Sequence, residues 1–274
     1  MSIFAGTDEI IFSALGLGPG ETLDHKSTCR RLGSTPLDVQ AISTLVSDLY
    51  RQVETNWSDR TPSRENWRVE RRITASPKNK SPEVLLEQSI SLMSEQGFLD
   101  GWYNQIPVAS GLIDGFADKR AAVDLLQFDG ESAALVELKW DSNNPAFAAF
   151  EILRYGLAFL FCYLNRDKFG YADKPLMAAK QVSLRVLAPH NFYNGYDLPW
   201  LGRGLDQSLR AFAATATGGA LTIDFAFTSF PQEFDLPPFR TGAEVASMRD
   251  LPADADPCRR IVAAVGDIKA VWAA

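Results

Sequence analysis

The sequence predicts an α/β protein with a mixed central β-sheet flanked by helices. Apolar segments with helical spacing alternate along the chain with short strand-like segments, and this alternation is typical of a sheet covered by helices. The apolar content is also high, since 46% of the 274 residues are hydrophobic. A chain of this length and composition has ample material for a sizeable core.

The first part of the chain predicts an irregular arm followed by a helix. Residues 1–35 are rich in Gly, Thr and Ser and show no firm periodicity. Residues 35–57 place apolar side chains three and four positions apart, as in an amphipathic helix, with Thr35 as its cap and Pro36 at the first helical position. The segment WRVERRI, residues 67–73, alternates weakly and predicts an edge strand.

A second helix is expected to begin at Pro82, where Ser81 can cap it and Glu83 complements its positive end. Gly97 is expected to end it. The remaining elements are predicted from their apolar patterns: strands over 103–109, 121–128, 133–140, 181–189 and 220–230, a long buried helix over 144–164, and a short terminal helix after residue 256. This order divides the chain into an N-terminal arm and helix packed on the core (1–65), a core (66–190) and a C-terminal extension with additional strands and a terminal helix (191–274).

Charge and composition exclude several classes of protein. The net charge of -7 disfavours a protein that coats nucleic acid by bulk attraction. Residues 64–80 nevertheless hold six basic residues against two acidic ones, and this segment is either a solvated charged face or a local basic patch. The three cysteines are widely spaced, which disfavours a zinc site or a disulfide framework.

No membrane span is expected, because the longest uninterrupted apolar run, Tyr155 to Leu164, is far shorter than the roughly 20 residues that a spanning helix needs. Acidic residues interrupt the apolar stretches near the start of the sequence and no basic residue precedes them, so a secretory signal is not expected either. We therefore expect a cytoplasmic protein.

The segment AAVDLLQFDGESAALVELKW, residues 121–140, reads as two apolar strands that carry three unexpected charges: Asp124, Glu137 and Lys139. Side chains alternate along a strand, so Glu137 and Lys139 share a face. A two-residue loop would place Asp124 diagonal to Glu137, and a four-residue loop would place the two carboxylates directly opposite each other. Either loop puts all three charges on one face.

Two carboxylates in directly paired positions, roughly 4.5–5.5 Å apart at their Cβ atoms, repel each other unless a cation neutralises them. Mg²⁺ or Mn²⁺ suits a set of carboxylate oxygens with a backbone carbonyl such as that of Leu138. The simpler alternative is a Lys139 salt bridge on the exposed face of an ordinary hairpin.

This pattern resembles the PD-(D/E)xK nuclease superfamily, which has the restriction-endonuclease-like fold. The resemblance covers residues 81–190: an acidic residue on the first helix, Glu87 or Glu83; Val123-Asp124 where the family has Pro-Asp; and Glu137-Leu138-Lys139 for the (D/E)xK motif. Glu151 to Tyr155 is similar to the Gln-xxx-Tyr signature of RecB-type members, with Glu in place of Gln. The resemblance implies a restriction-endonuclease-like core with N- and C-terminal extensions.

The resemblance also implies a function, namely metal-dependent hydrolysis of phosphodiester bonds. Asp124 and Glu137 would bind Mg²⁺ or Mn²⁺ together with the Leu138 carbonyl, and Glu87, preferred over Glu83, would hold a second ion or its water shell. Lys139 would position or deprotonate the attacking water and stabilise charge on phosphorus.

The remaining site residues implied by the resemblance are Glu151, Arg154 and Tyr155, which would contact the substrate. Glu151 and Arg154 could instead form an intrahelical ion pair.

Several alternatives stay open. The substrate is expected to be nucleic acid, DNA before RNA, and the protein could be a homodimer. The competing class is a catalytically silent nuclease-like fold that serves as a protein-interaction or assembly module, and a third is a related enzyme whose substrate is not a polynucleotide. A divalent-cation site separates the first two classes, because only the enzyme needs one.

Overall fold

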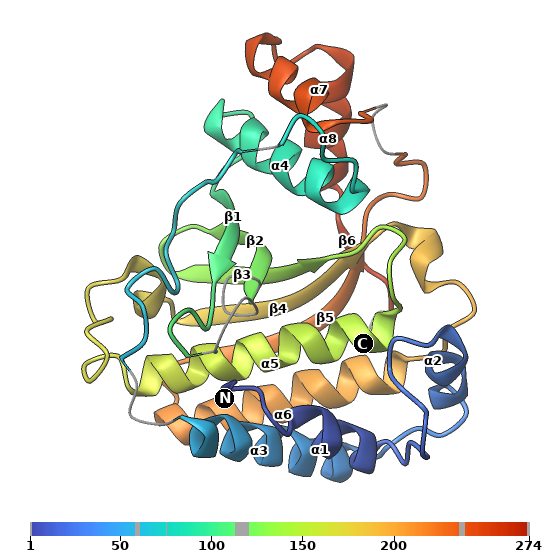
Figure 1. The fold of residues 1–274 in the computed structure, drawn as a ribbon, viewed down its shortest axis with the longest axis vertical. Helices are drawn as coiled ribbons and strands as arrows, with labels where there is room; N and C mark the ends of the chain where they lie inside the picture. Colours follow the sequence, from blue (N-terminus) through green and yellow to red (C-terminus); the bar gives the residue numbers. More distant parts are fainter. Residues whose placement is uncertain (1, 58–60, 75, 113–120, 236–238, 273–274) are drawn as a thin grey trace.

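The computed structural model describes residues 2–57, 61–74, 76–112, 121–235 and 239–272 (Figure 1). These residues form one mixed six-stranded sheet in the order β1-β2-β3-β4-β5-β6. The first three strands are antiparallel, β3, β4 and β5 are parallel, and β6 returns antiparallel to β5. The α/β class with a mixed sheet is therefore confirmed. The strands are β1 (Trp102–Pro107), β2 (Ala122–Phe128), β3 (Ser132–Leu138), β4 (Gln181–Ala188), β5 (Thr222–Ser229) and β6 (Lys269–Ala270).

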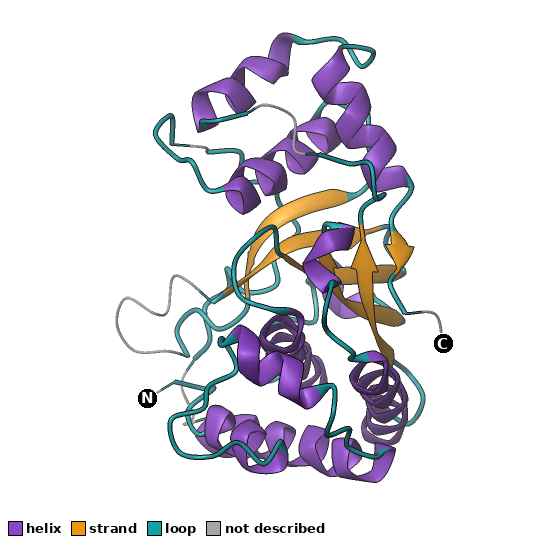
Figure 2. Ribbon diagram, turned by 90° about the vertical axis from the view of Figure 1, so that its right-hand side faces the viewer, coloured by secondary structure: helices purple, strands orange, loops and turns teal. Residues whose placement is uncertain are grey.

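Helices lie on both sides of this sheet, as Figures 1 and 2 show. Helices α5 and α6 cover one face, with α1 and α3 packed behind them, while α4, α7 and α8 gather on the other side. The helices are α1 (Thr7–Ala14), α2 (Lys26–Leu32), α3 (Val39–Asn56), α4 (Pro82–Glu95), α5 (Pro145–Leu164), α6 (Pro199–Thr217), α7 (Gly242–Ser247) and α8 (Asp256–Gly266). Two apolar clusters result, a large one that includes α5 and a smaller one that includes α4 and α8.

Helix α5 is apolar on nearly every side because it is enclosed by the sheet and by neighbouring helices. It is long and apolar enough to cross a membrane by length and composition, but most of its apolar window is buried inside the protein, which is consistent with a core helix of a soluble protein. Gly156 allows the helix to approach β4 closely, because a Cβ atom at this position would lie 2.4 Å from Cδ1 of Leu184.

Three expectations from the sequence are wrong at the N-terminal side. Residues 1–35 contain two helices, α1 and α2, whose apolar faces are too short to give a clear periodicity. Helix α3 begins at Val39 rather than at Pro36, because the cap is Asp38, whose side chain accepts a hydrogen bond from the Ala41 N–H.

The third wrong expectation is the edge strand over residues 67–73, which form no strand. Asn104 takes the place of a strand partner there, since its side chain accepts from the Arg72 N–H and donates to the Arg72 carbonyl.

The helix that precedes the hairpin begins and ends as the sequence predicts. Ser81 occupies the cap position of α4 and Pro82 the first helical position, although the Ser81 side chain makes no capping hydrogen bond. Gly97, with φ of 77°, follows the last turn. The long helix α6 was not predicted, because its apolar positions are interrupted by two glycines and several polar residues.

We expect Gly156→Ala to lower the free energy of unfolding by about 1–3 kcal/mol, because the added methyl group must displace Leu184 or move α5 away from β4. Thermal or chemical unfolding measures this change. Gly266→Ala is the matched control, since a Cβ atom there would meet nothing within 4 Å. Equal stability of the two variants would contradict the close helix–sheet contact.

Candidate active site

The β2–β3 hairpin brings the two predicted carboxylates together. The strands pair from Leu125–Val136 to Phe128–Ala133, so four residues, 129–132, lie between the last paired positions, and the register is that of the second loop considered above. Continuing this register by one residue places Asp124 opposite Glu137. Asp124 is held there because its Oδ2 accepts a hydrogen bond of 2.9 Å from the Leu138 N–H.

Lys139 is the cation that lies closest to these carboxylates. Its Nζ is 2.6 Å from Oε1 of Glu137 and 3.1 Å from Oε2 of Glu151. Glu137 is 3% exposed and Lys139 is 7% exposed, so the pair lies in the interior rather than on an open face. The second oxygen of Glu137, Oε2, is buried and has no hydrogen-bond partner among the described residues.

The surroundings of this pair shift the proton affinities of its members. Burial raises the pKa of Asp124 to about 6, although Lys139 and the Leu138 N–H oppose this shift. Burial and the charges of Asp124 and Glu151 raise the pKa of Glu137 well above its ordinary value. Burial alone would lower the pKa of Lys139, but the carboxylates outweigh it and raise the pKa above the usual range. Lys139 therefore stays protonated, and it does not neutralise the whole group.

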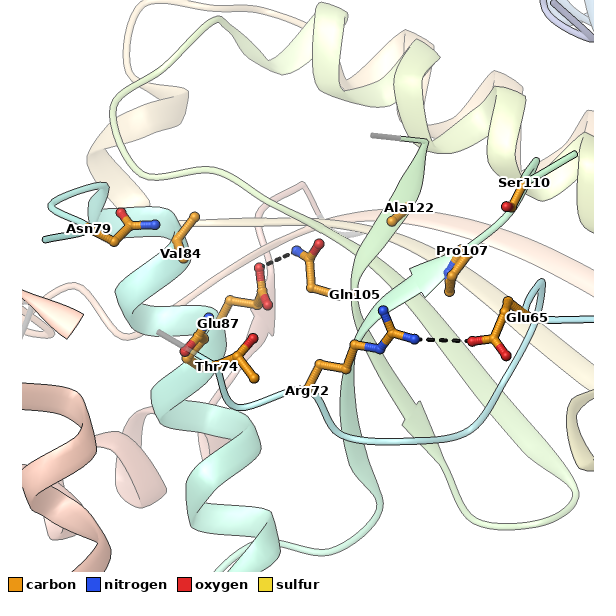
Figure 3. Close-up of a pocket in the computed structure, with 11 residues that line it drawn as sticks. Glu65, Arg72, Thr74, Asn79, Val84, Glu87, Gln105, Pro107, Ser110 and Ala122 are labelled. Carbon is orange, nitrogen blue, oxygen red and sulfur yellow. Dashed lines mark hydrogen bonds and ion pairs between the residues drawn. The ribbon is translucent and has the colours of Figure 1, made fainter. Parts of the chain in front are cut away.

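Glu87 of α4 is 2% exposed and is bound by two amide side chains of β1. Asn104 donates to its Oε1 at 2.7 Å. Gln105 donates to its Oε2 at 2.6 Å, as Figure 3 shows. Burial and the charge of Asp124 raise the pKa of Glu87 to about 8, in spite of these two hydrogen bonds. Glu87 is thus within electrostatic reach of the hairpin.

The arrangement of Asn104 and Gln105 depends on an unusual backbone. Neighbouring residues on a strand normally point to opposite faces, yet both amides reach the same carboxylate. Gln105 has φ of 52°, a left-handed conformation that few residues other than glycine adopt. The guanidinium of Arg68, itself buried, donates to the Gln105 carbonyl at 2.6 Å and holds this bend.

The other acid of the same helix, Glu83, has a different role. Its Oε1 accepts hydrogen bonds from the Trp140 N–H at 2.9 Å and from the Ser142 hydroxyl at 2.6 Å, so it ties the start of α4 to the segment after β3. Its charge also contributes to the raised pKa of Asp124. Both helix acids therefore lie near the hairpin, and Glu87 is the more deeply enclosed.

The three residues that the sequence assigns to substrate contact face different partners. Glu151 pairs with Lys139 rather than with Arg154. Arg154 turns toward α1, where it forms an ion pair of 2.9 Å with Asp8. Tyr155 packs near Phe4, and burial raises its pKa above the usual range, with a further contribution from the site carboxylates. Only Glu151 contacts the hairpin charges through a hydrogen bond or ion pair that the described residues show.

The basic segment 64–80 is largely engaged within the protein. Arg64 pairs with Asp173, and Arg71 lies 4.6 Å from the Tyr103 ring centroid. Arg72, paired with Glu65 at 3.0 Å, remains half-exposed and lines a pocket next to Glu87. Arg72 therefore borders the candidate site, while Arg64 and Arg71 are engaged by other parts of the protein.

The carboxylates near Lys139 offer oxygen atoms of the kind that a hard divalent cation binds. The charge of Asp124 acts on both Glu137 and Glu87, and one oxygen of Glu137 has no hydrogen-bond partner among the described residues. Within the described residues, no group of three or more His, Cys, Asp or Glu side chains is already arranged to hold a metal ion. In this arrangement Lys139 supplies the positive charge beside Glu137.

Asn104, Gln105 and Arg68 belong to the site but were not predicted from the sequence. The available signal was the pair of adjacent amides in the otherwise apolar segment 102–109. No family model, no curated protein and no solved structure matches this chain. The case for the site therefore depends on its own geometry and charge.

In metal-free protein we expect Glu87→Gln to flatten the dependence of stability on pH. Because the pKa of Glu87 is raised, its contribution to the free energy of unfolding is fully present below the ordinary pKa of 4.5. This contribution is lost as the pH rises toward about 8. Over this range the wild-type free energy of unfolding should fall with a slope of up to about 1.4 kcal/mol per pH unit from this group.

Chemical denaturation at a series of pH values measures this slope. Glu95→Gln is the control, because Glu95 lies on the exposed side of the same helix and pairs with Arg249. If Glu87→Gln and Glu95→Gln gave the same slope, Glu87 would not be the buried titrating group.

Proposed function

We propose that this protein is a metal-dependent nuclease that hydrolyses phosphodiester bonds of nucleic acid, DNA in the first instance, in the cytoplasm. The observation that carries the proposal is the excess of enclosed carboxylate around Lys139. Taking charges out of water is costly, so an uncompensated set of this kind is retained only where a cation or a proton completes it. The PD-(D/E)xK resemblance supports the same assignment and a restriction-endonuclease-like core.

Asp124, Glu137 and the Leu138 carbonyl are the groups that would hold Mg²⁺ or Mn²⁺. Glu87 is close enough to Asp124 for its negative charge to assist in binding the ion. When bound, such an ion polarises a phosphodiester oxygen and lowers the pKa of a coordinated water. The chain's own residues then have distinct tasks. Asp124 is fixed by the Leu138 N–H, and Glu87 is fixed by two amides, so the oxygens need little rearrangement on binding.

Lys139 is suited to stabilise negative charge rather than to act as a base. Its raised pKa keeps the ammonium protonated, and its two ion pairs hold it beside Glu137. A fixed cation in an enclosed site stabilises the charge that develops on phosphorus without reorganising water. Glu151 orients this cation from α5, which gives the residue in the Gln position of the family signature a positioning role.

A second candidate function is a catalytically silent nuclease-like fold that binds other proteins. Two observations favour it: Lys139 already neutralises part of Glu137, and Arg154 is occupied by Asp8. The overall charge of -7 points in the same direction. This candidate requires neither a metal site nor hydrolysis.

We expect purified protein with Mg²⁺ or Mn²⁺ to cleave single- or double-stranded DNA or RNA, and Asp124→Asn to reduce the rate by about 10²-fold or more. This substitution retains an oxygen that can accept from the Leu138 N–H, so the hairpin should keep its fold. Gel analysis of end-labelled substrates measures the rate. Glu131→Gln, in the exposed loop of the same hairpin, should cleave like wild type. Absence of cleavage by the wild type on all four substrates would remove the nuclease proposal.

We also expect Mg²⁺ or Mn²⁺ to raise the melting temperature of the wild type more at pH 8 than at pH 5. At the lower pH, protons compete for Asp124 and Glu137, whose raised pKa values favour the protonated forms. Glu137→Gln should lose most of this shift. Thermal scans with and without the ion separate the two candidate functions, because a silent interaction module predicts no shift in either protein.

A further inference from the structure

A pocket of about 650 Å³ opens directly beside Glu87, between the first half of α4, the β1–β2 pair and the segment that leads into α4 (Figure 3). Its volume lies in the range of pockets that enclose small organic ligands. Gln105 is part of its wall and binds Glu87. Glu87 itself lies in the wall and is close enough to Asp124 for the charge of Asp124 to act on it. The pocket therefore adjoins the carboxylate site.

The walls of this pocket combine two kinds of surface. Val84 on α4 and Pro107 and Ala122 on the strands give apolar surface on two sides, which Figure 3 shows with Gln105 between them. The other lining groups are mostly neutral hydrogen-bonding side chains, namely Thr74, Asn79, Gln88, Gln105 and Ser110. Such a lining suits a ring with apolar faces and a polar edge.

Gln88 contributes a largely buried carboxamide to the wall. It is only 6% exposed, and its side-chain oxygen has no partner among the residues that the structure describes. That oxygen is enclosed by protein atoms, so a ligand in the pocket would meet the rest of the Gln88 carboxamide. Carboxamide side chains are also common partners of the adenine edge in nucleic-acid recognition.

The charges at the pocket disfavour an anion as the main ligand. Among the lining residues that the structure describes, Glu65 and Glu87 are acidic, and the basic residue Arg72 is already paired with Glu65 at 3.0 Å. A neutral heterocycle carries no such penalty, while a phosphate attached to it could remain outside the pocket.

We propose that this pocket binds a nucleobase, and that in the nuclease it receives an unstacked base of the substrate next to the bond that is cut. The second part rests on the proposed function. A base held here would fix the position of its own strand beside Asp124 and Glu87, and such positioning favours reaction at the neighbouring phosphate. The nucleobase belongs either to a polynucleotide or to a free nucleoside.

The test begins with nucleoside binding in the presence of a chelator, so that cleavage and metal affinity do not enter. Adenosine, guanosine, cytidine and thymidine are titrated separately into the protein by calorimetry, and at least one should bind. Ala122→Phe, which fills the pocket, and Gln88→Leu, which removes the carboxamide, should each weaken that binding about tenfold or more.

Gln127→Leu is the matched control and should bind like wild type, because Gln127 lies on the same strand as Ala122 but lines a different pocket. Melting curves verify that each variant is folded. If Gln88→Leu does not fold, Ala122→Phe decides the result. No nucleoside binding by the wild type, or unchanged binding by folded Ala122→Phe, would overturn the inference.

A second arm identifies the source of the base. Single-stranded oligonucleotides that contain the preferred base, or an abasic residue in its place, compete against the bound nucleoside. Stronger competition by the intact strand than by the abasic strand supports a polynucleotide substrate. If neither strand competes, the base does not come from a polynucleotide, and a free nucleoside is the ligand.

The outcome is independent of the nuclease assay. Cleavage without nucleoside binding would overturn the nucleobase proposal and leave the nuclease proposal in place. Nucleoside binding without cleavage would leave only the nucleobase proposal in place.

Discussion

The candidate site depends on a single enclosed ammonium group that faces more negative charge than it can neutralise. Lys139 binds Glu137 and Glu151 directly, and Asp124 lies opposite Glu137 across the hairpin. In water such a group would be held apart by solvation, but here the sheet and α5 enclose it. The fold therefore keeps these side chains close against their mutual repulsion, and that cost is the reason to assign them a chemical role.

Three elements share the work of holding this group together. The four-residue connection of the hairpin sets the register in which Asp124 lies opposite Glu137. Helix α5 carries Glu151, and Gly156 lets this helix pack closely against β4. Helix α4 adds Glu87 from the other side of the sheet. Because each element contributes one or two charges, the site is a property of the packed sheet and does not exist in the hairpin alone.

Much of this arrangement was readable from the sequence, because strands and buried helices impose strong periodicities. The charges on residues 121–140 stood out against their apolar neighbours, and alternation placed them on one face. The choice between two loop lengths was not readable, because both preserve that alternation. Helices α1 and α2 were missed for lack of length, and the bend at Gln105 was missed because φ values of non-glycine residues leave no clear mark in composition. Residues 67–73 do not form a strand, and the backbone of Arg72 pairs there with the side chain of Asn104 rather than with the backbone of β1.

The left-handed backbone at Gln105 has a consequence for how β1 is aligned. A regular strand could slide along β2 by two residues and keep its apolar face inward. Here a slide of any length would carry the bend away from Arg68 and withdraw both amides from Glu87. The left-handed residue Gln105 therefore fixes the register of the edge strand β1 against β2.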